Sequence, residues 1–243
     1  MLAPSNWIRS SLQAGRDLFH FTLAQPSGPE ASGPSPVLVP IRSLGPSYRS
    51  RIAAHLLALE PQDRYLRFGY AASDEQVQRY VDQLDFERDE IFGIYNRRLE
   101  LIAMAHLAFS TDPKSASCAE FGVSVLKHAR GRGYGARLFD RAVMHARNEG
   151  VSLMFIHALS ENTAMLKIAR NAGATVERDG SESEAHLKLP PASLDSRVAE
   201  IVEQQFAELD YRLKVQAKQF RDTLASVQEI RRGVRQGRHQ SAQ

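Results

Sequence analysis

Apolar positions recur along residues 37–189 in two patterns, and their alternation predicts alternating strands and helices. Short apolar runs between turn residues predict strands, whereas apolar residues three and four positions apart predict helices. The predicted strands are Val37–Ile41, Ile91–Tyr95, Leu99–Phe109, Glu120–Val125, Leu153–His157, Thr175–Arg178 and Glu184–Leu189. The predicted helices are Tyr48–Leu59, a segment that begins after Ser73, a segment that begins at Ala136, and Asn162–Ala172. The elements therefore run strand, two helices, three strands, helix, strand, helix and two strands.

Turn and cap residues support these boundaries. Ser73 is a good N-cap, and Gln76 occupies the position of its capping-box partner. The segments Asn96–Arg98 and Asp179–Gly180 are suited to hairpin turns between neighbouring strands. The pattern thus predicts one domain over residues 37–190, with an extension on each side.

Residues 1–36 are expected to form a flexible N-terminal segment. The stretch Pro26–Pro36 is rich in Pro, Gly and Ser, as flexible linkers are. A short amphipathic helix could precede it, with the apolar residues Trp7, Ile8, Leu12, Leu18, Phe19 and Phe21. Because Arg9 and Arg16 would suit a membrane surface or an import signal, a targeting role is the alternative to disorder or local packing.

Residues 191–243 are predicted to form a basic, helical extension. Apolar residues recur at threes and fours within residues 193–232, namely Val202, Phe206, Leu209, Leu213, Ala217, Phe220, Leu224 and Val227. A helix of this length would extend about 60 Å, too far to be covered by a small domain alone. A coiled-coil homodimer or a partner helix is therefore favoured, and a hairpin that folds back is the alternative.

The net charge of +3 is unevenly distributed. From Arg212 to the end there are eight Lys and Arg residues and two acidic residues, Asp222 and Glu229. The tail therefore carries a net charge of +6 and the remainder of the chain a net charge of −3. Basic charge can attract acidic proteins, nucleic acid or membranes. A solvated helix face is the favoured interpretation, and no specific nucleic-acid partner is predicted.

The composition also limits the chemistry. A single cysteine, Cys118, excludes an intrachain disulfide, leaves no Cys/His cluster for a metal, and fits a reducing, cytoplasmic setting. No apolar run approaches the roughly 20 residues of a membrane-spanning helix, so a membrane location is not expected. Packed or surface roles are expected for the scattered histidines His55, His106, His128, His145 and His157. Among them, His106 borders the expected cleft.

The segment Arg130–Gly135, between a predicted strand and a predicted helix, is the strongest candidate for a binding site. Glycine lets the backbone approach an anion, and the helix that follows offers free N–H groups and the positive end of its dipole. Arg130 and Arg132 add positive charge, so the segment predicts a pyrophosphate site. A P-loop is excluded because Ala136 follows the last glycine, and the alternating glycines do not fit the dinucleotide pattern. A simple turn remains the alternative.

Three separate features resemble the GNAT acetyltransferase superfamily. The spacing Arg-x-x-Gly-x-Gly over Arg130–Gly135 resembles its acyl-CoA loop, and the apolar Val125 lies five positions before the arginine. Asn162 is followed eleven residues later by Gly173, as in the last helix of the family. The order of elements over residues 37–189 is similar to a whole GNAT domain. This resemblance implies an α/β (α+β) fold with a mixed, mostly antiparallel central sheet flanked by helices.

The resemblance implies transfer of an acetyl group from acetyl-CoA to a primary amine, on a protein lysine or a small molecule, without a metal. It implies main-chain contacts of Val123 and Val125 with pantetheine, and a contact of Asn162 with the pantetheine arm or adjacent backbone. The implied pyrophosphate site consists of Arg130, Gly131, Arg132, Gly133, Tyr134 and Gly135. Glu120, at the start of the same strand, is the expected general base.

One position departs from the family pattern. Many GNAT enzymes place a tyrosine seven residues after the asparagine to protonate the leaving thiolate, and here that residue is Ala169. The alternative function is therefore a non-catalytic acyl-CoA sensor or interaction module, with oligomerisation through the C-terminal helix.

The acceptor side rests on a second resemblance. Asp63–Phe68 is similar to an Arg-Tyr-x-Arg-Phe stretch in bacterial protein-lysine acetyltransferases, whose last helix also tends to begin Asn-x-x-Met, as Asn162–Met165 does here. Arg64, Arg67 and Tyr70 are therefore candidate acceptor contacts. The alternative is that the aromatic residues pack in the core and the arginines are solvated.

Overall fold

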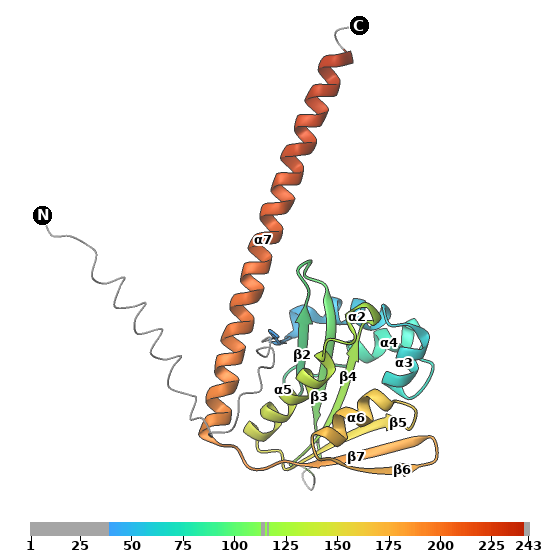
Figure 1. The fold of residues 1–243 in the computed structure, drawn as a ribbon. Coiled ribbons are helices and arrows are strands. Elements are labelled where there is room, and N and C mark those ends of the chain that lie inside the picture. Colours follow the sequence, from blue (N-terminus) through green and yellow to red (C-terminus); the bar gives the residue numbers. More distant parts are fainter. Residues whose placement is uncertain (1–38, 113–114, 116, 241–243) are drawn as a thin grey trace, which may run out of the picture. The chain divides into compact units, whose positions relative to one another are not determined.

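The computed structural model describes residues 39–112, 115 and 117–240, with side chains up to residue 222. Its centre is a seven-stranded sheet in the order β1-β2-β3-β4-β5-β7-β6 (Figure 1). The strands are β1 (Arg42–Ser43), β2 (Glu90–Tyr95), β3 (Leu101–Phe109), β4 (Cys118–Val125), β5 (Leu153–Leu159), β6 (Thr175–Asp179) and β7 (Glu182–Lys188). Only β4 and β5 pair in parallel. This mixed, mostly antiparallel sheet confirms the predicted fold class.

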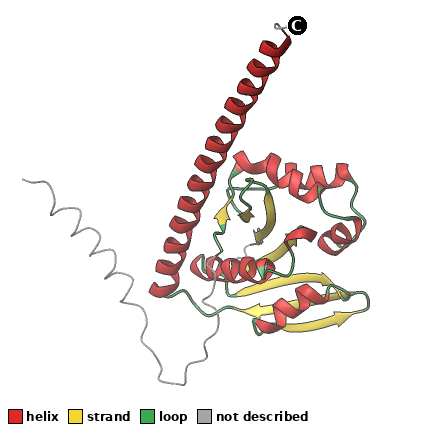
Figure 2. Ribbon diagram, turned by 45° about the horizontal axis from the view of Figure 1, so that its top comes forward, coloured by secondary structure: helices red, strands yellow, loops and turns green. Residues whose placement is uncertain are grey.

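Helices cover both faces of the sheet (Figure 2). They are α2 (Arg49–Leu57), α3 (Pro61–Phe68), α4 (Asp74–Asp82), α5 (Tyr134–Asn148), α6 (Thr163–Asn171) and α7 (Leu194–Gln240), with short 3₁₀ turns at Pro46–Tyr48 and Lys127–Ala129. One core cluster joins α5 and α6 to the sheet, and a second joins α2 and α4 to it. Both faces are therefore buried, which explains the nearly continuous apolar runs of β2 and β3.

The structure differs from the predicted elements in two places. The first strand was predicted at Val37–Ile41, but the first strand of the structure is β1, a short strand that pairs with β2. The first two residues of the predicted strand lie outside the described part. An additional helix, α3, lies between the two predicted helices. This helix has only 8 residues, none of them buried, and half of them are polar, so it was not predicted, although Pro61 at its start and Gly69 in the left-handed conformation at its end fit a short helix. The predicted capping box of Ser73 and Gln76 is confirmed at the start of α4.

The C-terminal extension is one continuous helix, α7, so the folded-back hairpin does not occur. Its first half packs against the domain. Glu200 contacts Arg141 and His145 of α5, and Glu208 contacts Arg42 of β1. Ala207, between them, is fully buried. The predicted N-terminal segment, residues 1–36, lies outside the described residues. None of the described helices is long and apolar enough to cross a membrane.

Candidate active site

The central opening of the sheet lies between β4 and β5. These strands pair only where Cys118–Glu120 faces Leu153–Phe155. Beyond this point β4 continues to pair with β3, and β5 with β7, but they no longer pair with each other. Backbone N–H and C=O groups on the facing edges of both strands are therefore available to an extended ligand. Two cavities flank this opening.

The first cavity, here the loop cavity, has a volume of about 580 Å³ and lies against the glycine segment. Gly131 and Gly133 both have φ of +75°, in the left-handed region that favours glycine. Gly133 is also the N-cap of α5, and no side chain caps the helix there. The first N–H groups of α5 are thus available to an anion. The predicted residues that line the loop cavity are Val123, Val125, Arg130, Gly131, Gly133, Tyr134, Gly135 and Asn162; Arg132 is not among them.

Arg130 fixes the glycine segment to its surroundings. Its guanidinium forms an ion pair with Asp63 of α3, and its Nε donates to the carbonyl oxygen of Val125 at the end of β4. The side chain remains about half exposed at the loop cavity. Arg130 therefore presents positive charge to the cavity, partly balanced by Asp63. Asp63 is the one carboxylate in this lining, against the cations Arg67, Arg130 and Lys167.

The second cavity, here the hairpin cavity, has a volume of about 610 Å³ and extends from β4 to the β6–β7 hairpin. Its lining is acidic, with the carboxylates Glu120, Glu177, Asp179, Glu182 and Glu184 against Arg67 and Arg178. Glu120 lies on β4 where the strands begin to separate, and its side chain is exposed. The predicted general base therefore reaches a cavity that can attract a cationic amine.

The two cavities meet at a small set of shared residues. Leu66, Arg67, Val123, Asn162 and Met165 line both. Asn162 is the N-cap of α6, and its side-chain oxygen accepts from the N–H of Met165. Its Nδ2 also donates weakly to the carbonyl oxygen of Leu66, at 3.5 Å. Asn162 therefore joins the start of α6 to α3 at the junction of the cavities.

The three candidate acceptor contacts occupy different surroundings. Arg67 lines both cavities, whereas Arg64 and Tyr70 line neither. Arg64 instead binds the carboxylate of Asp74 and the carbonyl oxygen of Leu57, which joins α3 to the neighbouring helices. Tyr70 is about half exposed. An acceptor role for Arg64 and Tyr70 stays a prediction. It would require that their side chains move toward the cavities or that the acceptor extends beyond them.

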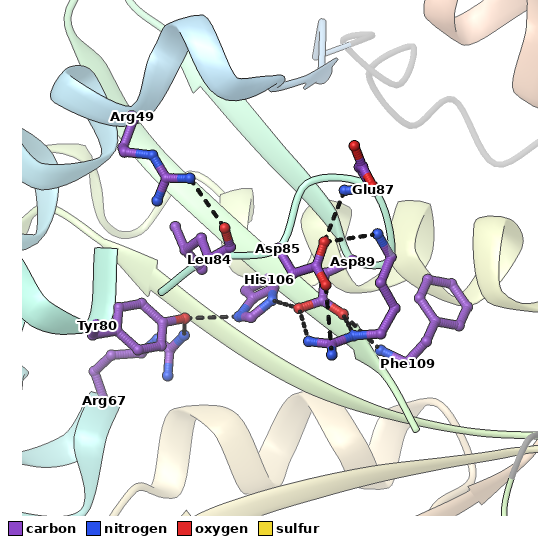
Figure 3. Close-up of polar contacts among 10 residues, drawn as sticks. Arg49, Arg67, Tyr80, Leu84, Asp85, Glu87, Asp89, His106 and Phe109 are labelled. Carbon is purple, nitrogen blue, oxygen red and sulfur yellow. Dashed lines mark hydrogen bonds and ion pairs between the residues drawn. The ribbon is translucent and has the colours of Figure 1, made fainter. Parts of the chain in front are cut away.

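A chain of polar contacts that the sequence did not indicate leads to Arg67 (Figure 3). Arg67 donates to the hydroxyl oxygen of Tyr80 at 2.9 Å. That hydroxyl lies 2.7 Å from Nδ1 of His106, whose Nε2 lies 3.0 Å from Asp89. Tyr80 belongs to the helix predicted after Ser73, and His106 was expected only to border the cleft. The sequence did not mark Asp89 as a candidate functional residue, because a single acidic residue in a turn before a strand is common.

Other polar residues near β4 have structural roles. His55 is buried and lies 2.8 Å from both the carbonyl oxygen of Leu101 and the hydroxyl of Ser124. Burial lowers its pKa to about 4, so it is neutral at physiological pH. Ala169 is fully buried in the core below α6. Within the described ranges, no three His, Cys, Asp or Glu residues are grouped to hold a metal.

Comparisons with known proteins agree with this geometry. Residues 54–174 match the model of the Acetyltransferase (GNAT) family. The structure is similar to the GNAT domain of PAT from S. lividans, with a TM-score of 0.54, 21% identity, and coverage of 63% of this chain and 95% of that domain. It is also similar to a GNAT-family acetyltransferase from Streptococcus pneumoniae, with a TM-score of 0.51, 12% identity, and coverage of 62% and 98%.

A third similar structure is a GNAT-family acetyltransferase from Staphylococcus aureus Mu50, with a TM-score of 0.50, 12% identity, and coverage of 62% and 98%. No curated protein sequence matches the chain. The similar structures establish the fold, and the family model adds the sequence match across α2 to the end of α6. Through this domain the chain belongs to the GNAT family of acetyltransferases.

Proposed function

We propose that the chain transfers an acetyl group from acetyl-CoA to a cationic primary amine, with Glu120 as the general base. The observation that carries this proposal is the meeting of two cavities of opposite charge at the opening between β4 and β5. The cationic loop cavity suits the diphosphate of CoA. The acidic hairpin cavity suits an ammonium group, on a protein lysine or a small molecule.

The donor would bind along the opening. Its diphosphate would accept from the N–H groups of the glycine segment and the first turn of α5, next to Arg130. Its pantetheine arm would pair with the free edge of β4 at Val123 and Val125, in the manner of an added strand. Asn162 would contact the arm from α6. This arrangement brings the thioester to the junction of the cavities.

The acceptor would approach from the hairpin cavity. An ammonium group must lose a proton before its nitrogen can attack, and Glu120 is an exposed carboxylate on the same cavity wall. Glu120 would take this first proton, directly or through a water molecule, and pass it to solvent. The neutral nitrogen then attacks the thioester carbon, and the second proton, which the nitrogen gives up as the amide forms, passes to Glu120 and on to water. Backbone N–H groups along the free edge of β4 are placed to stabilise the oxyanion.

The test is release of CoA thiol from acetyl-CoA with a panel of amines and lysine-containing peptides. Glu120→Gln is expected to lower kcat about 10²-fold with acetyl-CoA binding unchanged, since general-base catalysis contributes this order of rate. Glu149→Gln, an exposed glutamate at the end of α5, is the matched control. Binding of acetyl-CoA with no turnover for any amine would favour the non-catalytic sensor, which the family membership does not favour.

A further inference from the structure

Transfer from a thioester produces a thiolate, and this anion needs a proton or a nearby positive charge to leave readily. Ala169 supplies neither, because it carries no polar group and is fully buried. The group that performs this task must lie where the thioester lies, at the junction of the two cavities. The five residues that line both cavities are therefore the candidates.

Arg67 is the single charged residue among these five. Its guanidinium lies directly over Gly122 of β4, so close that a β-carbon on Gly122 would be 2.8 Å from it. Gly122 lies on the free edge of β4, two positions after Glu120 and on the same face. Arg67 thus lies over the backbone that would receive the thioester, and it lines the same cavity as the predicted base.

The positive charge of Arg67 is not neutralised by a carboxylate within the described part of the chain. Its guanidinium contacts the hydroxyl of Tyr80 and the ring faces of Phe68 and Tyr80. By contrast, Arg64, Arg130 and Arg141 each form an ion pair. The charge of Arg67 is therefore available to an anion that forms at the junction.

A sequence of hydrogen bonds holds Arg67 in this place (Figure 3). Burial alone would raise the pKa of Asp89, but hydrogen bonds from His106 and Arg88 lower it well below its usual range, so Asp89 is ionised. The ionised Asp89 accepts from Nε2–H of His106, which leaves Nδ1 to accept from the hydroxyl of Tyr80. The hydroxyl oxygen then accepts from Arg67. The direction of each hydrogen bond therefore determines which group donates and which accepts in the next one.

We infer that Arg67 is a catalytic residue that stabilises the leaving CoA thiolate, and that Tyr80, His106 and Asp89 are positioning residues that hold it over Gly122. This inference rests on the proposed function. In the step, the neutral amine nitrogen, which has already lost one proton through Glu120 to solvent, forms the C–N bond and gives its second proton to Glu120. The C–S bond breaks, its electron pair stays on sulfur next to the guanidinium, and the thiolate later takes a proton from water.

The test measures the acidity of the thiol of bound CoA, which requires neither an acceptor nor turnover. Thiolate absorbance is followed against pH for the CoA complex, with the desulfo-CoA complex as blank. In the native protein the bound thiol is expected to titrate at least one pH unit below free CoA measured in the same way. In Arg67→Met it should return to the value of free CoA or above, and Arg67→Lys should retain part of the shift.

Two further variants make this test specific. Tyr80→Phe should raise the pKa of the bound thiol by less than Arg67→Met does. The charge of Arg67 remains in this variant, but the hydroxyl that positions the guanidinium is lost. Arg178→Met, an arginine that lines only the hairpin cavity, should leave it unchanged. Equal thiol pKa values in the native protein and in Arg67→Met would overturn the inference, and Arg67→Gln answers the same question if the methionine variant does not fold. Binding of CoA without turnover would refute the proposed function, and with it the catalytic role of Arg67, but not its effect on the acidity of the bound thiol; failure to bind CoA would refute all three.

A separate observation concerns α7, whose exposed side is apolar. Nine large hydrophobic residues are exposed in the described part of the chain, and all but Tyr70 lie on α7. They are Leu194, Val198, Ile201, Val202, Phe206, Leu209, Leu213 and Phe220. At 100° per residue they lie opposite the stripe of Glu200, Ala207 and Lys214 that contacts the domain. One side of α7 is therefore covered and the other is not.

The exposed stripe has the spacing of a coiled coil. Val202, Phe206, Leu209, Leu213, Gln216 and Phe220 alternate in steps of four and three. The sequence continues this register through Thr223, Val227, Ile230 and Val234. A seam with this 3.5-residue period pairs with another helix of the same period.

The charges of α7 identify the partner as a second copy in antiparallel orientation. Residues 194–210 carry five acidic residues against Arg197; Glu200 and Glu208 contact the domain, which leaves a net charge of −2 for a partner helix, whereas residues 211–240 carry a net charge of +6. Two parallel copies would place like charges together, while antiparallel copies place each acidic half beside a basic half. We infer that the chain forms a homodimer through an antiparallel α7 coiled coil.

Light scattering of the full chain tests the dimer, and the expected mass is twice that of the monomer. Leu209→Asp combined with Leu213→Asp should give the monomer mass, and Gln204→Asp, an exposed residue beside the stripe, should not. Cysteine cross-linking tests the antiparallel orientation, with the native cysteine removed by Cys118→Ser. Two chains that both carry Val202→Cys should not cross-link to each other, whereas a chain with Val202→Cys should cross-link to a chain with Val227→Cys. A monomeric native chain, or ready self-cross-linking at position 202, would overturn the inference.

Discussion

Arg67 and Gly122 are complementary in shape: the guanidinium of the arginine occupies the space that a side chain at position 122 would take. A β-carbon there would be 2.8 Å from the guanidinium carbon of Arg67. No real β-carbon tolerates this distance, so one of the two groups must move. The flexible arginine moves more easily than the strand, which is paired on its other side with β3.

Gly122→Ala should therefore displace Arg67 without unfolding the protein. We expect kcat to fall about tenfold or more, because a shift of about 1 Å in a catalytic group can cost this much. The KM for acetyl-CoA should change little, since the glycine segment is untouched. Steady-state kinetics with both substrates, beside thermal unfolding, measures this. An unchanged kcat would mean that the position of Arg67 does not matter to the reaction.

The ion pair of Arg130 with Asp63 leads to a second prediction. Arg130→Ala removes a cation from the loop cavity and leaves the carboxylate of Asp63 facing the diphosphate of CoA. The Kd for CoA should rise about tenfold or more, since a charge-assisted hydrogen bond is worth about 1.5–3 kcal/mol. The double variant with Asp63→Asn should recover part of the loss. Calorimetric titration with CoA measures both, and equal losses in the single and double variants would contradict the repulsion by Asp63.

The sheet and most helices were predictable because their signals are local. The alternation of apolar runs and 3.6-residue stripes located the strands from Ile91 onward and the helices that face the core. The glycine segment was equally visible, because left-handed backbone at Gly131 and Gly133 requires glycine and because its spacing is distinctive. The helix α3 was missed because it is only 8 residues long and half of these residues are polar.

The junction of the cavities was not predictable, because it depends on contacts between distant segments. Arg67 of α3 meets Gly122 of β4 and Tyr80 of α4, and Asp89 reaches His106 across the pairing of β2 with β3. Each of these residues is ordinary in its own sequence neighbourhood. The sequence showed that Arg67 was a candidate, but only the fold distinguishes it from Arg64, three residues away, whose charge is neutralised by Asp74.

Asp89→Asn tests the contacts behind Arg67. An amide can donate from Nδ2, which conflicts with the Nε2–H of His106 and disturbs the contacts of Tyr80 and Arg67. We expect kcat to fall several-fold. The free energy of unfolding should also fall by about 2 kcal/mol at pH 7, because Asp89 accepts three further hydrogen bonds, from Arg88 and from the N–H of Phe109.

The stability part of this prediction depends on pH. The folded-state pKa of Asp89 is lowered, so its contribution is present above the unfolded value of 3.8 and is lost as pH falls below it. In urea unfolding, the stability difference between the native protein and the variant should therefore begin to shrink as pH falls below 3.8, and should go on shrinking as pH approaches the lowered folded-state pKa. A loss of stability that stays constant between pH 7 and pH 3 would indicate that the amide disturbs packing and not the charged contacts.

Glu200→Gln is expected to loosen α7 from the domain. Glu200 accepts from His145 and Asn148 and forms an ion pair with Arg141, whose side chain is buried. The glutamine would leave that guanidinium without its counter-ion. The loss in free energy of unfolding should be about 1–2 kcal/mol at pH 7, less than for a fully buried pair because water still reaches Glu200. Asp195→Asn, an exposed residue of the same helix, should cost less than about 0.5 kcal/mol.

The pH dependence of this contact distinguishes charge from shape. Burial alone would raise the pKa of Glu200, but hydrogen bonds from His145 and Asn148 and the charge of Arg141 lower it to about 2. The stabilisation is therefore complete above the unfolded pKa of 4.5 and is lost as pH falls toward 2. Hydrogen exchange of α7 residues 194–214 should be faster in Glu200→Gln than in the native protein at pH 7, and equal in both near pH 2 once exchange rates are corrected for pH. Equal exchange at pH 7 would show that the apolar contacts around Ala207 are enough to hold the helix.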